Sequence, residues 1–327
     1  AAGDLSGESI AINDTGDVII VGASNNTGAN GSSSGHARVW LWNGNSWIQK
    51  GSDLDGDSAG DGFGDSAAIS SDGNTVAAGS MSYDGGGNTD NGQIKVYSWS
   101  NGWVQKGASI QGNNGNKIGA NLSMSGDGNT LAAGGEGLVK AYYYNGNNWQ
   151  QKGTDLLIAG QTNEIHKVSL SNNGNILSIS ANNNTVKTYS WNGSTWILRA
   201  TNTGTGGFGS SISIDSTGSK IAIGSQNDNS NGTLKIYYWD GSNYVQMSDI
   251  KDVAAVAVAD DEWGEAVGVV IVPTDMTAPP EIEAIKTYVR DQLRSSRVPT
   301  QVKFTEELPY NETGKLLRRV LRNGFST

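Results

Sequence analysis

Residues 71–107 read SDGNTVAAGSMSYDGGGNTDNGQIKVYSWSNGWVQKG, and this stretch decides the fold because four other stretches repeat its plan. Its segments 75–80 and 94–99 are short, rich in β-branched, aromatic or small residues, and bounded by clusters of glycine and asparagine. Such segments are typical of β-strands, and Asp-Gly and Asn-Gly supply the positive φ angles that tight hairpin turns require.

The plan occurs five times between residues 1 and 250. One recurring feature is a turn centred on glycine, and successive turn glycines lie 57, 55, 46 and 44 residues apart. The turn glycines are Gly16, Gly73, Gly128, Gly174 and Gly218. The other feature is a pair of aromatic residues that flank a second glycine turn. The pairs are Trp42 with Trp47, Trp99 with Trp103, Tyr144 with Trp149, Trp191 with Trp196, and Trp239 with Tyr244.

Each unit reads as four strands, and four antiparallel strands at this period are typical of a β-propeller blade. We therefore predict an all-β five-bladed β-propeller of five four-stranded repeats over residues 1–250. The five blades can close a ring by themselves or form part of a larger ring, and we favour closure by the five.

Short phrases between the units carry a family resemblance. Gly60-Asp61-Gly62-Phe63-Gly64 precedes one unit and Gly206-Gly207-Phe208-Gly209 another. Together with VAAGS at 76–80 and WVQKG at 103–107, they make residues 3–249 resemble the FG-GAP-like repeats of bacterial surface and secreted proteins, related to the integrin alpha propeller. The resemblance implies a non-enzymatic scaffold for adhesion or binding at the cell surface or outside the cell, with a protein or glycan of unknown identity as its partner.

One loop of the repeats is acidic. Asp53, Asp55, Asp57 and Asp61 stand close together in a glycine-rich segment, and a hard cation such as Ca²⁺ needs that density of oxygen ligands. Integrin-like repeats bind calcium in comparable loops, so the resemblance implies a calcium site, although the equivalent loop at residues 111–116 has no carboxylate. A solvated acidic turn without metal is the other interpretation, and no further cofactor is indicated.

The aromatic pairs also have two interpretations. They can stack on sugar rings through their apolar faces, or they can be cross-strand neighbours that stabilise each hairpin. We favour the structural role because a structural need recurs in every unit, whereas a ligand site does not have to.

The chain changes character near residue 250. Residues 251–327 hold all five prolines but only four of the 46 glycines, and they show no repeat. Apolar runs at 253–258 and 266–272 predict two strands, an amphipathic pattern after Pro279-Pro280 predicts a helix, and 301–304 predicts a third strand. We also expect a short basic helix at 315–322. A small α/β domain over 251–327 follows.

Three phrases of this segment resemble the carboxy-terminal subdomain of adenylate-forming enzymes, which include the acyl-CoA synthetases. They are DDEWGEAV at 260–267, RVP at 297–299 followed by Val302 and Phe304, and ELPYNETGKLLRR at 307–319. In that family the lysine after Thr-Gly enters the active site, which implies that role for Lys315. The resemblance begins only in the second half of the subdomain, and residues 1–250 lack a phosphate-binding loop. We therefore expect no complete enzyme, although the motif around Lys315 keeps the question open.

Charge and composition narrow the choice of function. The net charge of −10 argues against a nucleic-acid partner, the absence of cysteine excludes thiol chemistry, and no apolar run is long enough to span a membrane. Our first interpretation is the binding or adhesion scaffold with an incomplete AMP-binding segment. The alternatives are a fragment of an acyl-CoA synthetase-like ligase, whose family is cytoplasmic, or a chimera without a selected function.

Overall fold

The chain is mostly β, with 49% of residues in strands and 5% in helices. The structure, a computed structural model, describes residues 3–28, 30–157, 166–181, 184–228, 232–247, 250–260, 264–273, 276, 279–292 and 298–325. It contains two compact units. The first comprises residues 1–235 with 239–244, and the second comprises 236–238 with 245–327.

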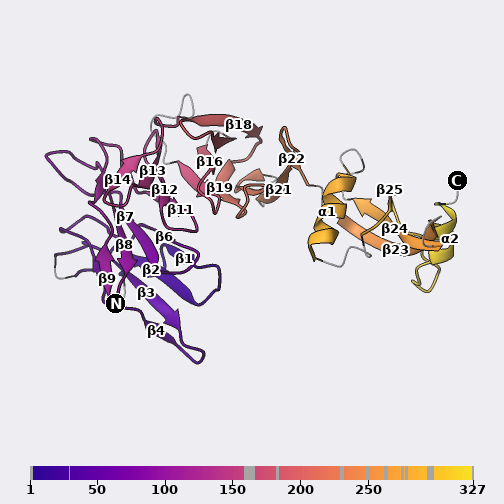
Figure 1. Ribbon diagram of the computed structural model, residues 1–327, viewed down its shortest axis with the longest axis horizontal. Helices are drawn as coiled ribbons and strands as arrows, with labels where there is room; N and C mark the ends of the chain where they lie inside the picture. The colour runs from indigo at the N-terminus through magenta and orange to yellow at the C-terminus, as the bar shows by residue number, and fades with distance from the viewer. Residues whose placement is uncertain are drawn as a thin grey trace. The chain divides into compact units, whose positions relative to one another are not determined.

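Five antiparallel sheets follow one another along the chain, and in each sheet four consecutive strands pair in sequence order (Figure 1). The first holds β1 (Ile10–Ile12), β2 (Val18–Ala23), β3 (His36–Trp42) and β4 (Trp47–Gln49). The second holds β6 (Ser66–Ile69), β7 (Thr75–Ser80), β8 (Gln93–Trp99) and β9 (Trp103–Gln105). The third holds β11 (Asn121–Met124), β12 (Thr130–Gly134), β13 (Val139–Tyr144) and β14 (Trp149–Gln151). The fourth holds β15 (Lys167–Leu170), β16 (Ile176–Ala181), β17 (Thr185–Trp191) and β18 (Trp196–Thr203). The fifth holds β19 (Phe208–Ile214), β20 (Lys220–Ser225), β21 (Thr233–Trp239) and β22 (Tyr244–Gln246).

The first two sheets exceed the expected four strands. β5 (Leu54–Asp55) pairs with β3, and β10 (Ile110–Gln111) pairs with β8. Both form because the chain leaving the outermost strand runs back beside the third strand for two residues.

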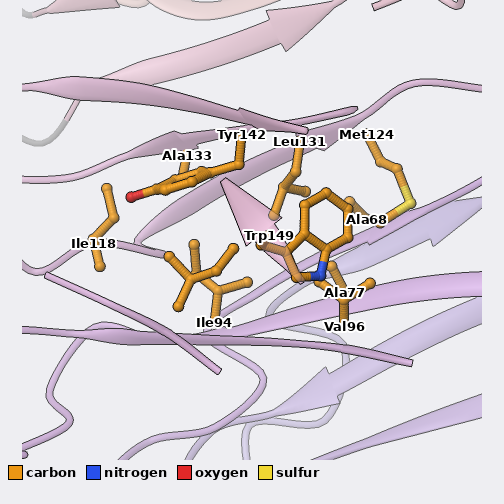
Figure 2. Close-up of a cluster of buried hydrophobic side chains, with 11 residues drawn as sticks. Ala68, Ala77, Ile94, Val96, Ile118, Met124, Leu131, Ala133, Tyr142 and Trp149 are labelled. Atoms are coloured by element: carbon orange, nitrogen blue, oxygen red, sulfur yellow. The ribbon is translucent and has the colours of Figure 1, made fainter. Parts of the chain in front are cut away.

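Apolar cores lie between successive sheets. Figure 2 shows the core between the second and third sheets, where Trp149 lies among Leu131, Ala77 and Val96. Similar clusters join the first sheet to the second and the third to the fourth. Because the first four sheets bury apolar side chains against one another, removal of this surface from water holds them together.

The starts of the five glycine turns are joined one to the next by backbone hydrogen bonds. Asp14 N donates to Ser71 O at 3.2 Å, Ser71 N to Gly126 O at 2.9 Å, Gly126 N to Asn172 O at 2.7 Å, and Asn172 N to Ser216 O at 2.8 Å. A pocket of about 210 Å³ is lined by residues of all five sheets, including these five. All five sheets therefore converge on the same centre.

The expected closure of a ring by five units is not seen in the burial of the first sheet. Ile10 and Ile12 on β1 are 70% and 58% exposed. At the corresponding edge of the fourth sheet, Val168 and Leu170 on β15 are buried against the third. Among the residues that the structure describes, no sheet covers the apolar face of β1.

The aromatic pairs are cross-strand neighbours, as the structural interpretation predicted. Trp42 pairs with Trp47, Trp99 with Trp103, Tyr144 with Trp149, and Trp191 with Trp196 in the strand register. The five pairs have ring centroids 5.1–5.7 Å apart in tilted or edge-on geometry. Such contacts stabilise hairpins.

The second unit contains a three-stranded sheet in the order β23-β24-β25 (Figure 1). β23 (Ile250–Asp260) and β24 (Gly264–Pro273) are antiparallel, and β25 (Gln301–Phe304) is parallel to β24. α1 (Ile282–Gln292) precedes β25, and α2 (Arg318–Asn323) ends the described elements. Val256, Val270 and Val272 form the core with Leu308 and Leu321. The three strands and the first helix confirm their prediction.

The last helix differs from its expected range of 315–322. It begins at Arg318 because the preceding residues form a tight hairpin, closed by a bridge between Tyr310 and Leu316. Lys315 therefore lies in a turn and not in a helix.

Candidate functional site

One asparagine organises the turn that carries Lys315. Asn311 Oδ1 accepts hydrogen bonds from Thr313 N at 3.1 Å, from Lys315 N at 2.8 Å and from the Thr313 hydroxyl at 2.8 Å. Asn311 N donates to Lys315 O at 3.0 Å, which closes the hairpin. Gly314 has φ of 77°, which glycine adopts without a steric clash. The sequence Asn-Glu-Thr-Gly-Lys therefore fixes the point at which the lysine side chain leaves the backbone.

The base of this turn is attached to the sheet. Tyr310 donates its hydroxyl proton to Asp252 Oδ2 on β23 at 2.7 Å, and this hydrogen bond raises the pKa of Tyr310. Leu316, on the other side of the turn, packs against the apolar core of the second unit. The sequence motif identified Lys315, but the roles of Asn311, Tyr310 and Asp252 depend on contacts that the motif does not show.

Lys315 itself is exposed at the end of the turn, opposite Asn311. A lysine is a compact charge on a flexible stem, suited to a carboxylate or phosphate oxygen. Arg318 and Arg319, also exposed, begin α2 three residues later and add positive charge nearby. This arrangement can present a cation to an anionic ligand held by another domain.

Aspartate side chains of the acidic loop in the first unit form ion pairs and accept backbone hydrogen bonds. Arg38 donates to both carboxylate oxygens of Asp53, at 2.9 and 2.7 Å, and this pairing holds the pKa of Asp53 below its usual range. Lys95 forms an ion pair with Asp57. Asp61, only 4% exposed, accepts hydrogen bonds from the backbone N–H groups of residues 57 and 58, while burial raises its pKa.

The side chains of Asp53 and Asp55 lie close to His36, at the start of β3. Ligand atoms of these three side chains lie within 4.8 Å of one another. His36 is buried, and burial lowers its pKa. The four aspartates therefore do not converge on one point in the described structure, and calcium binding in this loop stays a prediction. A calorimetric titration with Ca²⁺ tests it.

Comparisons with known proteins concern the C-terminal part of the chain. Residues 242–315 match the family model described as the AMP-binding enzyme C-terminal domain. A long-chain-fatty-acid–CoA ligase of Salmonella typhimurium is 42% identical over 79 residues, which are 24% of this chain and 14% of that ligase. A long-chain-fatty-acid–CoA ligase of Mycobacterium tuberculosis is 30% identical over 82 residues, 25% of this chain and 16% of the ligase. An oxalate–CoA ligase of Arabidopsis thaliana is 31% identical over 77 residues, 24% and 15% of the two chains.

These matches confirm the AMP-binding part of the sequence-based resemblance. The chain spans about one-seventh of the length of the curated relatives it matches, within their AMP-binding C-terminal domain. What it shares with the ligases is therefore an incomplete enzyme. The match begins at residue 242, a few residues before the boundary that we predicted at 250, and that boundary stays a prediction.

The same matches overturn our first interpretation of function. We expected a non-enzymatic scaffold for adhesion or binding, and this was wrong, because the relatives are acyl-CoA ligases. The alternative, a ligase fragment, agrees with them. They give no support to an extracellular location, which depended on the resemblance of the repeats.

Two further sequence-based expectations concern a membrane-spanning segment and the remaining motif residues of the second unit. No helix among the residues that the structure describes is long and apolar enough to cross a membrane. Three motif residues of the second unit, Asp261, Glu262 and Trp263, lie outside the described residues, as does Arg297.

Proposed function

We propose that the C-terminal unit is the closing segment of an acyl-CoA ligase and supplies Lys315 to an active site formed by a separate, large amino-terminal domain. The observation that carries this proposal is the exposed Lys315 at the end of a turn organised by Asn311, inside the segment that matches the ligases. The ammonium group orients the substrate carboxylate and stabilises the charge that develops on the phosphate during adenylation. A fatty acid is the substrate class that most of the matched relatives are named for.

A graft tests this proposal. The Salmonella ligase, cut where its matched C-terminal segment begins, is fused to residues 245–327 of this chain. We expect fatty-acid-dependent exchange of pyrophosphate into ATP to return, and we expect the present chain by itself to catalyse none. The Lys315→Ala graft should lose the exchange, while Arg290→Ala, which removes an exposed cation on α1, should retain it. A folded graft that is active without Lys315 would refute the role of the lysine.

We also propose that the five sheets of the first unit are blades of an FG-GAP-like β-propeller. Their convergence on one pocket supports this, as does Phe63 of the Gly-Phe-Gly phrase, which is fully buried in the core between the first two sheets. Ser71 Oγ, in the second repeat, donates to Asn172 Oδ1, in the fourth repeat, at 2.9 Å. Because the chain has no cysteine, the Ser71→Cys, Asn172→Cys double variant should form a disulfide on oxidation. Reduced cysteines in the folded double variant would contradict the common centre.

A further inference from the structure

Successive repeats are joined by a contact that occurs four times. It involves a cation socket, which we define as the aromatic pair of one repeat with the turn-glycine carbonyl of that repeat and the side chain that follows it. In the second repeat the socket comprises Trp99, Trp103, Gly73 and Asn74. Lys50 of the first repeat fills it, with its Nζ 5.2 and 5.4 Å from the two ring centroids, 2.8 Å from Gly73 O and 2.9 Å from Asn74 Oδ1.

The next sockets are filled in the same way. Lys106 lies over Tyr144 and Trp149, Lys152 lies over Trp191 and Trp196, and Arg199 lies over Trp239 and Tyr244. Each of these cations also donates to the carbonyl of the turn glycine, at 2.7–3.1 Å. Every filled socket thus receives its cation from the preceding repeat.

In three filled sockets the aromatic pair also contacts the backbone of the incoming segment. The indole N–H of Trp103, Trp149 or Trp196 donates to the backbone carbonyl of the incoming lysine, at 2.6–2.8 Å. A glycine follows each lysine, and at Gly153 an added Cβ would lie 2.9 Å from the Trp196 ring. The ligand of these three sockets is therefore a Lys-Gly peptide segment, which glutamine precedes in each case.

The socket of the first repeat is open. Trp42 and Trp47 have the same tilted geometry as the filled pairs, with centroids 5.7 Å apart, but no cation lies over them among the described residues. They are 41% and 40% exposed, whereas Trp149 and Trp196, the counterparts of Trp47 in two filled sockets, are 8% and 7% exposed. The indole N–H of Trp47 has no hydrogen-bond acceptor within the described part of the chain.

The open socket also offers a negative charge to a cation, as the second and third sockets do through Asp72 and Asp127. Asp17 follows Gly16 where the filled lysine sockets carry an asparagine. Hydrogen bonds from Thr15 and Asn13 hold the pKa of Asp17 below its usual range, so its carboxylate is charged at neutral pH. The exposed Ile10 and Ile12 extend the uncovered surface along β1 of the same repeat.

We propose that the open face of the first repeat binds a further repeat of the same kind, which inserts a Gln-Lys-Gly segment between Trp42, Trp47 and Asp17. The fifth repeat of this chain does not carry that segment. In its sequence, Tyr244-Val245-Gln246 leads to Met247, where the earlier repeats have Lys50, Lys106, Lys152 and Arg199. Neither ring closure by the fifth repeat nor the fifth repeat of a second copy can therefore supply the ammonium group.

An extended chain tests this proposal. A copy of residues 108–153 is placed directly before Gly3, because Asp4-Leu5 then stands at the same distance from the new Lys-Gly as Asp53-Leu54 stands from Lys50-Gly51. Hydrogen exchange of the Trp47 indole N–H is measured by NMR, with Trp47→Phe to assign the signal. We expect exchange to slow about tenfold or more in the extended chain, the factor that corresponds to 1.4 kcal/mol.

The matched control replaces the lysine of the added copy by methionine, as in the fifth repeat, and should lose the protection. Equal protection by the lysine and methionine copies would overturn the proposal, as would a Trp47 indole already protected in the unextended chain. If the extended chain does not fold, a peptide of residues 139–153 is titrated onto the unextended chain. A shift of the Trp47 indole signal that requires the peptide lysine supports the proposal, and no shift at millimolar peptide refutes it.

Discussion

The repeat unit and the C-terminal unit distribute their important residues in opposite ways. In the repeats, the aromatic pairs occur five times and their cations four times, each in the same geometry. In the C-terminal unit, the turn with Asn311 and Lys315 occurs once. A contact that recurs in every repeat is explained by the stability of the array, whereas a single exposed lysine on an ordered turn is better explained by chemistry. Repetition within one chain thus separates structural residues from functional ones.

The largest effect should come from Phe63→Ala. Phe63 is fully buried between the first two sheets, and a large-to-small change at such a site costs about 3–5 kcal/mol of folding free energy. Hydrogen exchange measured by mass spectrometry should accelerate throughout the repeats and stay unchanged in residues 250–325. Faster exchange in both units would show that they do not unfold separately. The contrast between the repeat unit and the C-terminal unit would then be wrong.

Lys315→Ala should separate function from stability. In the grafted ligase we expect the exchange activity to fall about 10²–10³-fold, the effect of removing one stabilising group from a developing charge. The melting temperature should not change, because the lysine side chain is exposed and Asn311 still holds the turn. A fall in melting temperature would instead give Lys315 a structural role like that of the repeat lysines.

Lys106→Met should show the reverse behaviour. It removes a half-buried ammonium group that lies over two rings and donates two hydrogen bonds, so we expect a loss of about 1–3 kcal/mol in urea denaturation. Lys220→Met, at an exposed lysine on β20, is the control and should change stability by less than about 0.5 kcal/mol. Equal losses would mean that the filled sockets contribute no specific stability.

The smallest effect concerns pH. Burial raises the pKa of Asp65 to about 6, above the value of about 3.9 expected in the unfolded chain. The folded chain therefore binds this proton more tightly, and the cost of burying the charged carboxylate is present above pH 6 and relieved as the pH falls towards 4.

Asp65→Asn should consequently stabilise the chain by about 1 kcal/mol at pH 7.5 and by less at pH 5. Urea denaturation at the two pH values measures this difference. The acceptor for Met81 N, now at 3.1 Å from Asp65 Oδ2, is kept as an amide oxygen. The same gain at both pH values would show that the charge of Asp65 is not the cause.

The strands and the aromatic pairs could be predicted from the sequence because both depend on neighbours within one hairpin. The ion pairs of Asp53 and Asp57 could not, since Arg38 and Lys95 approach from other strands. The cation sockets were also missed, although WVQKG at 103–107 was visible as a repeated phrase, because the lysine acts on the next repeat and not on its own. Lys315 could be proposed from the sequence because its motif is contiguous, whereas Asp252, which anchors the turn, lies 58 residues before Tyr310.

Because Met247 stands where the earlier repeats have a cation, the two ends of the array differ. This difference affects where gene duplication can add a repeat. A duplication of any interior repeat reproduces a junction in which a lysine or arginine meets an aromatic pair, so the lengthened array stays complementary. A repeat added after Met247 would meet a thioether in place of a cation and would start from a weaker junction. Growth of this array by duplication is therefore favoured inside it or ahead of its first repeat, and disfavoured at its end.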